Sequence, residues 1–369
     1  MSGVVLSIDA MGGDRAPASV LGGLAKALRE RPDLRFILHG DEARLAPLLR
    51  KGAPLTERVE LRPAPDVVAM DAKPSQVLRR GRSTSMWKAL EAVRDGEASA
   101  VVSAGNTGAL MAMALFCLRA APGVKRPAIG ALWPSRNASG YSLALDMGAD
   151  VRADAEDLVL YALMGAEYAR VRFQAARPRV GLLNVGVEET KGLPEIKEAG
   201  AELRRLSEDP ALGFEYVGFV EANDIFSGEV DVVVTDGFTG NAALKSAEGA
   251  AKFVGESLKS AFAHTWLSRL GAFFAYPSLR RFKKRIDPRQ ANGGVFLGLN
   301  GLVIKSHGGA DATAYASAVA LAADLAREDV GSRIAAGVRK ATPPSAVPVP
   351  GAPPAGLIIP PRREEGGAS

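Results

Sequence analysis

Five stretches of the sequence place glycine beside carboxylate, amide or cationic side chains, each directly after an apolar run. They are SIDAMGGDRAP (7–17), VVSAGNTGAL (101–110), LLNVGVEETKG (182–192), VVVTDGFTGNAALK (232–245) and VIKSHGGADA (303–312). Glycine lets backbone amides approach a ligand closely, and a helix that starts after the turn favours an anion. The alternative is that these residues only form turns and helix caps. Because five such stretches occur together, we expect an anion-binding site.

The kind of anion can be narrowed from the glycine spacing. No glycine is followed two positions later by another, so the dinucleotide fingerprint is absent, and no Gly-Lys pair marks a nucleotide phosphate loop. This favours a small oxyanion such as inorganic phosphate. The residues that we expect to bind it or the substrate are Asp9, Gly12, Gly13, Asp14, Asn106, Thr107, Asp236, Thr239, Gly240, Lys245 and Asp311. Lys191 is a further source of positive charge.

One histidine and the single cysteine are the remaining reactive side chains of interest. His307 stands in a Gly-rich loop, and its unperturbed pKa of about 6.5 suits a general acid or base. Cys117 lies in an apolar helix-like run, which favours a core thiol over a nucleophile. The sequence shows no metal-ligand cluster, so we expect a direct, metal-free mechanism without a cofactor.

The loops must be positioned by strands that alternate with helices. Apolar runs recur at 4–8, 34–38, 99–103, 128–132, 143–145, 179–183, 214–220, 231–235 and 302–304. This alternation predicts a mostly parallel sheet with helices on both faces, and WPSRNASG (133–140) predicts an added hairpin. Since the carboxyl ends of parallel strands share one edge, we expect all five loops to build one polar cleft there.

Composition limits the class of protein and its domain organisation. The formal net charge is +5, and RRFKKR (280–285) carries five positive charges, which indicates one basic patch and no general nucleic-acid surface. A single cysteine fits a reducing cytoplasm. We expect one α/β domain over residues 1–340, with 250–290 as an amphipathic helical excursion. The tail, 341–369, holds eight of the 23 prolines and is expected to be disordered.

The excursion combines a bulky apolar stripe with the basic patch. We expect a long helix over 241–276, ended or kinked by Pro277, with apolar residues every three or four positions. Such a surface suits a peripheral membrane contact with anionic headgroups, although the same helices could pack against a second subunit. The expected membrane residues are Phe262, Trp266, Leu270, Phe273, Phe274, Arg280, Arg281, Lys283, Lys284 and Arg285.

Taken together, the motifs resemble the bacterial phosphate acyltransferase family, PlsX. The segments that show the resemblance are IDAMGGD, SAGNTGA, LNVGVEETKG, VVVTDGFTGNAALKSAEG and the GLNG…HGGAD region. The resemblance extends over about residues 4–339. The resemblance implies a three-layer α/β/α sandwich like that of phosphotransacetylases and isocitrate-type dehydrogenases. It also implies a homodimer that is cytoplasmic and peripherally attached to membrane. Departures include Asp150, where Asn is usual, and EAND at 221–224.

The activity implied by the resemblance is reversible formation of acyl phosphate from acyl-[acyl-carrier protein] and inorganic phosphate. The product would pass to a membrane glycerol 3-phosphate acyltransferase, early in phospholipid synthesis. In this mechanism Lys191 holds phosphate, and Asn184 or Asn241 donates to the carbonyl oxygen. Two alternatives stay open: a phosphotransacetylase-like enzyme that uses acyl-CoA, and a non-catalytic, membrane-associated phosphate- or lipid-binding protein.

Overall fold

A computed structural model describes residues 3–50, 53–286 and 292–341, except for the side chains of 53–54 and 282–286. Within these residues the strands are β1 (Val5–Asp9), β2 (Arg35–Gly40), β3 (Val59–Pro63), β4 (Ala100–Ser103), β5 (Ala128–Pro134), β6 (Tyr141–Leu145), β7 (Arg179–Leu183), β8 (Glu215–Val220), β9 (Val232–Val234), β10 (Gly294–Leu297) and β11 (Leu302–Lys305). They form one sheet in the order β3-β2-β1-β4-β11-β10-β5-β6-β9-β7-β8.

The helices begin and end as follows. They are α1 (Ala18–Glu30), α2 (Glu42–Leu49), α3 (Ala53–Thr56), α4 (Pro74–Arg80), α5 (Ser85–Arg94), α6 (Thr107–Leu118), α7 (Ala155–Arg172), α8 (Pro194–Ser207), α9 (Gly237–Ala263), α10 (Trp266–Ile286), α11 (Ala312–Arg327) and α12 (Val330–Ala341), with 3-10 turns η1 (Gly81–Ser83) and η2 (Asp224–Phe226).

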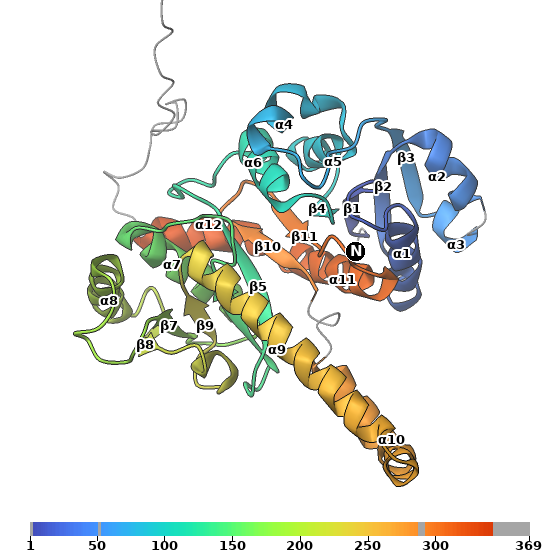
Figure 1. Cartoon of the computed structure of the whole chain (residues 1–369). Coiled ribbons are helices and arrows are strands. Elements are labelled where there is room, and N and C mark those ends of the chain that lie inside the picture. The colour runs from blue at the N-terminus through green and yellow to red at the C-terminus, as the bar shows by residue number, and fades with distance from the viewer. Residues whose placement is uncertain (1–2, 51–52, 287–291, 342–369) are drawn as a thin grey trace, which may run out of the picture.

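Helices cover both faces of the sheet, so the predicted three-layer α/β/α sandwich is confirmed (Figure 1). Alternate residues of each strand supply the two cores, because successive side chains of a strand point to opposite faces. In β4, Ala100 and Val102 belong to the core cluster that includes residues of α1, α7 and α11, whereas Val101 belongs to the cluster that includes residues of α5 and α6. The burial of both faces explains why most strands read as continuous apolar runs.

The sequence analysis did not predict two of the described strands, β3 and β10. The edge strand β3 carries charged residues, and β10 lies close to a stretch of Gly and Asn, so neither has a long apolar run. The hairpin predicted over 133–140 is confirmed, because β5 and β6 pair antiparallel through Trp133 and Ser142.

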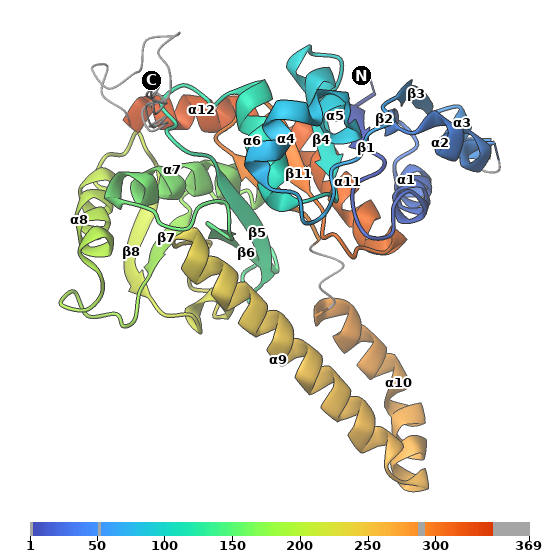
Figure 2. The same ribbon diagram turned by 45° about the horizontal axis from the view of Figure 1, so that its top comes forward.

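The amphipathic excursion forms a helical hairpin, α9 and α10, that projects away from the sandwich (Figure 2). The expected continuous helix over 241–276 is wrong, because the break falls at His264 and Thr265. Pro277 does not end the second helix, since α10 continues through it; the alternative that it kinks the helix stays a prediction. The Thr265 hydroxyl accepts a hydrogen bond from the Ser268 amide at 3.0 Å, which caps the start of the second helix. The predicted disordered tail lies outside the described residues.

Candidate functional site

The directions of the strands divide the five loops into two groups. Strands β1, β4 and β11 run parallel, but β6, β7 and β9 run opposite to them, because β10 and then the β5–β6 hairpin reverse the direction. The expectation that all five loops share one edge is therefore wrong. Four strand spacings of about 4.8 Å also separate β11 from β9, or about 20 Å sideways.

The first group is organised around the buried carboxylate of Asp9 at the end of β1. Its Oδ1 accepts hydrogen bonds from the Gly12 amide at 3.1 Å and the Ser85 hydroxyl at 2.6 Å. Its Oδ2 accepts one from the Ser103 hydroxyl at 2.6 Å. Burial raises the pKa of Asp9, and these donors oppose the rise. Asp9 thus holds its own loop against β4 and α5, leaving that loop's remaining amides for a ligand.

Glycine is required where the three loops of this group meet. A Cβ on Gly12 would lie 2.3 Å from Asp9 Oδ2 and 2.8 Å from the Gly105 amide nitrogen. Gly13 has φ +101°, in the left-handed region that side chains disfavour. The Asp14 amide donates to the Gly308 carbonyl at 2.9 Å. The loops after β1, β4 and β11 are therefore in direct contact.

Two predicted ligands of this group act as helix caps. The Asn106 side chain accepts from the Ala109 amide at 2.8 Å and donates to the Met70 carbonyl at 2.6 Å. Thr107 is the first residue of α6. The Asp311 carboxylate accepts from the first-turn amides of α11, at 2.9 Å. Both helices thus point their N-termini, with partial positive charge, toward the same edge as the glycine loops.

Lys305 is the residue of this group that the sequence analysis missed. It ends β11, and its ammonium donates a hydrogen bond to the Ser306 carbonyl. Burial lowers the pKa of Lys305 to about 8, although the negative charges of Asp9 and Asp14 oppose this. Within the described residues no carboxylate lies within ion-pair distance of it. The available signal was a lysine closing an otherwise buried apolar strand, beside a glycine loop.

His307 lies on the same edge and is exposed. Its Nδ1 accepts a hydrogen bond from the Gly309 amide at 3.2 Å, and its own amide donates to the Asn292 side chain at 3.1 Å. This arrangement fixes the loop and leaves Nε2 directed to other partners. A role as general acid or base is compatible with this position.

The second group is centred on Asn184 and Lys191, after β7. Asn184 is buried; its amide nitrogen donates to the Lys191 carbonyl at 3.2 Å, and its Oδ1 has no partner among the described residues. A Cβ on Gly192 would lie 2.1 Å from that oxygen. The Lys191 ammonium is exposed and pairs with Glu188 at 2.8 Å, which raises the pKa of Lys191. Asn184 therefore braces the loop that carries Lys191.

The loop after β9 completes the second group. Asp236 caps α9, accepting from the Thr239 amide at 2.9 Å and from its hydroxyl at 2.7 Å. A Cβ on Gly240 would meet the Asp146 carbonyl oxygen at 1.9 Å, so this glycine allows α9 to pack closely. Asn241 is exposed, and Lys245 is exposed and paired with Glu248 at 2.8 Å. Among the polar residues described in this loop, Asn241 is the one predicted site residue whose side chain has no recorded hydrogen bond or ion pair.

Asp146 is a second residue that the sequence analysis missed, and its role is structural. Its buried carboxylate accepts from the Ile129 amide and from the Asp150 amide, both at 2.8 Å. Burial raises the pKa of Asp146, and these backbone donors oppose the rise. Asp150, one of the departures from the family pattern, forms an ion pair with Arg126.

The prediction that Cys117 is a core thiol is confirmed by its burial. Burial raises the pKa of Cys117, so its reactive thiolate form is disfavoured. The described residues contain no group of three His, Cys, Asp or Glu side chains that could hold a metal ion.

We expect Cys117→Ser to keep wild-type turnover, because the direct mechanism expected from the sequence uses no thiol nucleophile. Intact mass spectrometry of the protein incubated with acyl donor should show no covalent adduct. An acyl adduct on any residue would contradict direct transfer.

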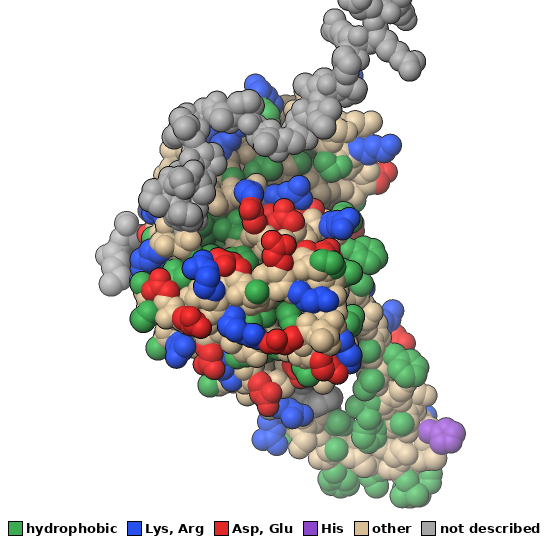
Figure 3. Space-filling model, turned by 90° about the vertical axis from the view of Figure 1, so that its left-hand side faces the viewer, with side chains coloured by type: hydrophobic (Ala, Val, Ile, Leu, Met, Phe, Trp, Pro, Cys, Tyr) green, Lys and Arg blue, Asp and Glu red, His purple; other side chains and the backbone are tan. Residues whose placement is uncertain are grey.

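The α9–α10 hairpin presents an apolar surface to solvent. Phe273 and Phe274 are 73% and 74% exposed, Trp266 is 72% exposed, and Leu270 is 46% exposed. Hydrophobic side chains gather over the projecting hairpin (Figure 3). Arg280 and Arg281 are exposed as well, while the side chains of Lys283, Lys284 and Arg285 lie outside the described set. Of the helices described, none is both long and apolar enough to cross a bilayer.

Comparison with known proteins shows the family to which the chain belongs, which the geometry of the loops does not identify. A family described as "Fatty acid synthesis protein" matches residues 4–333. A phosphate acyltransferase from Jannaschia sp. (strain CCS1) is 57% identical over 345 residues, 94% of each chain. One from Paracoccus denitrificans (strain Pd 1222) is 57% identical over 336 residues, 91% of this chain and 90% of the relative.

Solved structures confirm the fold. A phosphotransacetylase from Streptococcus pyogenes superposes with a TM-score of 0.58 at 19% identity, over 88% of this chain and 94% of the other. The EutD phosphotransacetylase from Staphylococcus aureus gives 0.56 at 17% identity, over 88% and 94% of the two chains. These likenesses concern the architecture of the sheet and its helical layers.

Proposed function

The chain belongs to the family of phosphate acyltransferases, and from this premise we propose that it transfers an acyl group from acyl-[acyl-carrier protein] to inorganic phosphate. The observation that carries the proposal is 57% identity over 94% of both chains to a phosphate acyltransferase. The glycine loops that meet beside Lys305 support it, because they offer backbone amides and one partly buried cation to a small oxyanion. The reaction is an early step of phospholipid synthesis.

The chemistry is a direct displacement at the thioester carbonyl. A phosphate oxygen attacks the carbonyl carbon, the carbon–sulfur bond breaks, and the thiolate leaves with the electron pair. The proton of hydrogen phosphate passes to the thiolate, so the products are acyl phosphate and the free thiol. His307 is our candidate for carrying that proton, since its imidazole lies on the edge of the sheet where phosphate would bind.

Phosphate lies between the loops after β1, β4 and β11 in this proposal. The amides of Gly13 and the first turn of α6 donate to it, and Lys305 balances its charge. Lys191, Asn184 and Asn241 form a rival group on the opposite edge. Of these, Asn184 is already engaged with the Lys191 carbonyl, which favours the first group for phosphate.

A turnover assay tests the function against its alternatives. Pure protein is incubated with phosphate and either an acyl-carrier-protein thioester or acyl-CoA, and acyl phosphate is trapped with hydroxylamine. Preference for the carrier-protein thioester supports the proposal, and preference for acyl-CoA favours a phosphotransacetylase-like enzyme. No turnover with either donor favours a non-catalytic phosphate- or lipid-binding protein.

The α9–α10 hairpin is the membrane contact in our proposal, with the protein cytoplasmic, homodimeric and peripherally attached. The exposed aromatic side chains would enter the lipid boundary, while the basic cluster, 280–285, meets anionic headgroups. A membrane glycerol 3-phosphate acyltransferase would then receive acyl phosphate near its site of formation.

The two parts of this contact should separate in a vesicle-binding experiment. Replacing the cations of 280–285 by Gln should weaken binding to anionic vesicles and flatten its salt dependence, because such charges are screened over about 8 Å at physiological salt. Phe273→Ser with Phe274→Ser should weaken binding at every salt concentration. Co-sedimentation measures both, and turnover in solution should persist. If both variants sediment like the wild type, the hairpin is not a membrane contact.

A further inference from the structure

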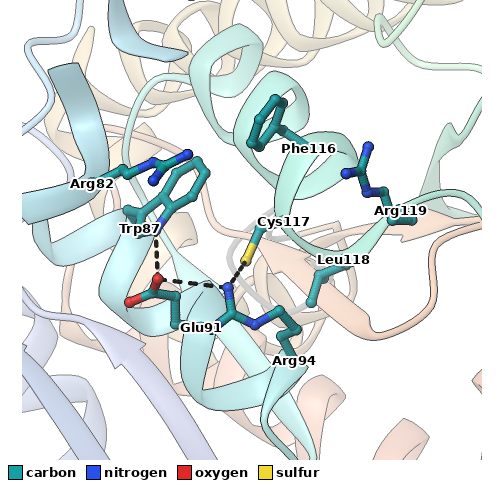
Figure 4. Close-up of a pocket in the computed structure, with 8 residues that line it drawn as sticks. All are labelled: Arg82, Trp87, Glu91, Arg94, Phe116, Cys117, Leu118 and Arg119. Atoms are coloured by element: carbon teal, nitrogen blue, oxygen red, sulfur yellow. Dashed lines mark hydrogen bonds and ion pairs between the residues drawn. The ribbon is translucent and has the colours of Figure 1, made fainter. Parts of the chain in front are cut away.

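A pocket of about 480 Å³ lies between α5 and the end of α6, away from the residues placed in the reaction so far. It is lined by Arg82, Trp87, Glu91, Arg94, Phe116, Cys117, Leu118 and Arg119. Figure 4 shows the two rings and the three guanidinium groups around the opening. The lining therefore combines aromatic rings with three guanidinium groups and the single carboxylate of Glu91, which lies beside Arg94.

The aromatic and cationic side chains are organised in pairs. The rings of Trp87 and Phe116 lie 5.8 Å apart between centroids, tilted by 46°. The guanidinium of Arg82 lies 5.8 Å from the Trp87 ring centroid, and that of Arg119 lies 5.4 Å from the Phe116 ring centroid. Phe116 is 45% exposed although it lies inside a helix whose other face is core. Trp87 is only 3% exposed, so it backs the exposed Phe116 from the core. An exposed Phe beside exposed Arg side chains is typical of protein-binding surfaces.

Two of the three arginines carry charge that no neighbouring carboxylate balances. Arg94 pairs with Asp95 at 2.8 Å and contacts Glu91 at 3.6 Å. For Arg82 and Arg119, no carboxylate of the described residues lies within ion-pair distance. Cations left in this state beside the rings of Trp87 and Phe116 favour an acidic partner.

The backbone of Arg119 is held in an unusual conformation that directs it to this pocket. Its φ of 68° and ψ of 161° lie in a region that is almost restricted to glycine. Its amide still donates to the Leu115 carbonyl at 3.2 Å, so it terminates α6 in an ordered way. A flexible surface arginine would not need this constraint.

The pocket is connected to the glycine loops through the first turn of α5. Ser85 donates to Asp9, a Cβ on Gly105 would lie 2.4 Å from the Met86 methyl carbon, and the next residue, Trp87, lines the pocket. Along α6, the twelve residues from Thr107 to Leu118 span about 18 Å. A partner seated at the pocket would therefore need an arm of about that length to reach the loops.

We propose that this pocket docks an acidic protein that carries the thioester on a long flexible arm, namely the acyl donor of the proposed function, on which this inference rests. Carboxylates of the partner pair with Arg82 and Arg119, while an apolar side chain packs on Phe116. The arm runs along α6 to the glycine loops, where phosphate attacks. A small free thioester would gain nothing from the two arginines at this distance.

Charge reversal tests the surface by two readouts, direct binding of the carrier protein and steady-state kinetics. Arg82→Glu with Arg119→Glu should raise the Kd and KM for the carrier protein at least tenfold and flatten their salt dependence. The phosphate KM and the kcat at saturating donor should stay unchanged. Phe116→Ser should raise the Kd at every salt concentration. The matched control, Arg44→Glu with Arg50→Glu on α2, changes the net charge equally and should bind like the wild type.

Three outcomes would overturn the docking surface. One is a wild-type Kd in the folded Arg82→Glu, Arg119→Glu variant, with folding checked by circular dichroism. Another is an equal loss in the α2 control, which would indicate a general charge effect. The third is a change of oligomeric state in light scattering, which would make this face an interface between copies. If the wild-type protein shows no turnover, the proposed function is refuted. The binding measurement with the carrier protein still tests the docking surface by itself.

Discussion

Lys305→Met is expected to raise the phosphate KM about thirtyfold, equivalent to about 2 kcal/mol, while making the folded protein more stable. The first effect follows because the ammonium would supply charge-assisted hydrogen bonds to phosphate. The second follows because a partly buried cation without an ion pair costs folding energy that methionine avoids. Opposite changes in activity and stability are the signature of a residue retained for binding.

The pH dependence of both effects has a defined sign. The pKa of Lys305 is about 8 in the folded protein, against an ordinary value of 10.5. Between pH 8 and pH 10.5 this side chain is therefore protonated in the unfolded chain and largely deprotonated in the folded protein. Wild-type stability gains from this group as pH rises from about 8 to 10.5. The stabilising effect of Lys305→Met is therefore largest below pH 8. The wild-type phosphate KM should rise above pH 8, and the variant should lack that rise.

Steady-state kinetics and thermal unfolding measure these changes. Lys125→Met, at an exposed lysine paired with Glu156, is the control and should alter neither. Lys191→Met discriminates between the two edges of the sheet. If Lys191→Met raises the phosphate KM and Lys305→Met leaves it unchanged, phosphate binds at the opposite edge and our placement is wrong.

The sequence predicted the three layers and the glycine loops of the candidate site. It did not predict which of these loops lie on the same edge of the sheet. Alternating apolar runs and helical patterns predict a parallel sheet, and five glycine loops mark the strand ends. The reversal depends on β10, a four-residue strand with weak periodicity that pairs antiparallel with both neighbours. Long-range pairing of so short a strand has no local signal, and it decides which loops share an edge.

Side-chain roles show the same limit. Asp9, Asp236 and Asp311 look alike as acids at strand ends, yet the first is buried among four donors and the others cap helices. Lys305 was not predicted as a site residue, because a lysine at the end of a strand is usually exposed to solvent. Its environment depends on residues distant in sequence: the charges of Asp9 and Asp14 act on it, and the Asp14 amide bonds to the Gly308 carbonyl of the loop after β11.

Gly12→Ala is expected to lower turnover at least a hundredfold and to destabilise the fold by about 1–3 kcal/mol. The added methyl would lie 2.3 Å from Asp9 Oδ2 and 2.8 Å from the Gly105 amide nitrogen, so the loops after β1 and β4 must separate. Separation breaks the bond from the Gly12 amide to Asp9 and moves the amides that would bind phosphate. A buried carboxylate would then lose a donor that opposes its desolvation.

The measurement pairs turnover with chemical denaturation, because the two losses have different origins. Gly331→Ala, in α12, is the control: a Cβ there meets nothing within 4 Å, so it should keep full activity and gain up to about 1 kcal/mol of stability. Ser103→Ala removes another donor to Asp9, and we expect its turnover to lie between those of Gly12→Ala and Gly331→Ala. A folded Gly12→Ala protein with wild-type kcat and phosphate KM would show that the close contact of these loops is structural, and that phosphate binds elsewhere.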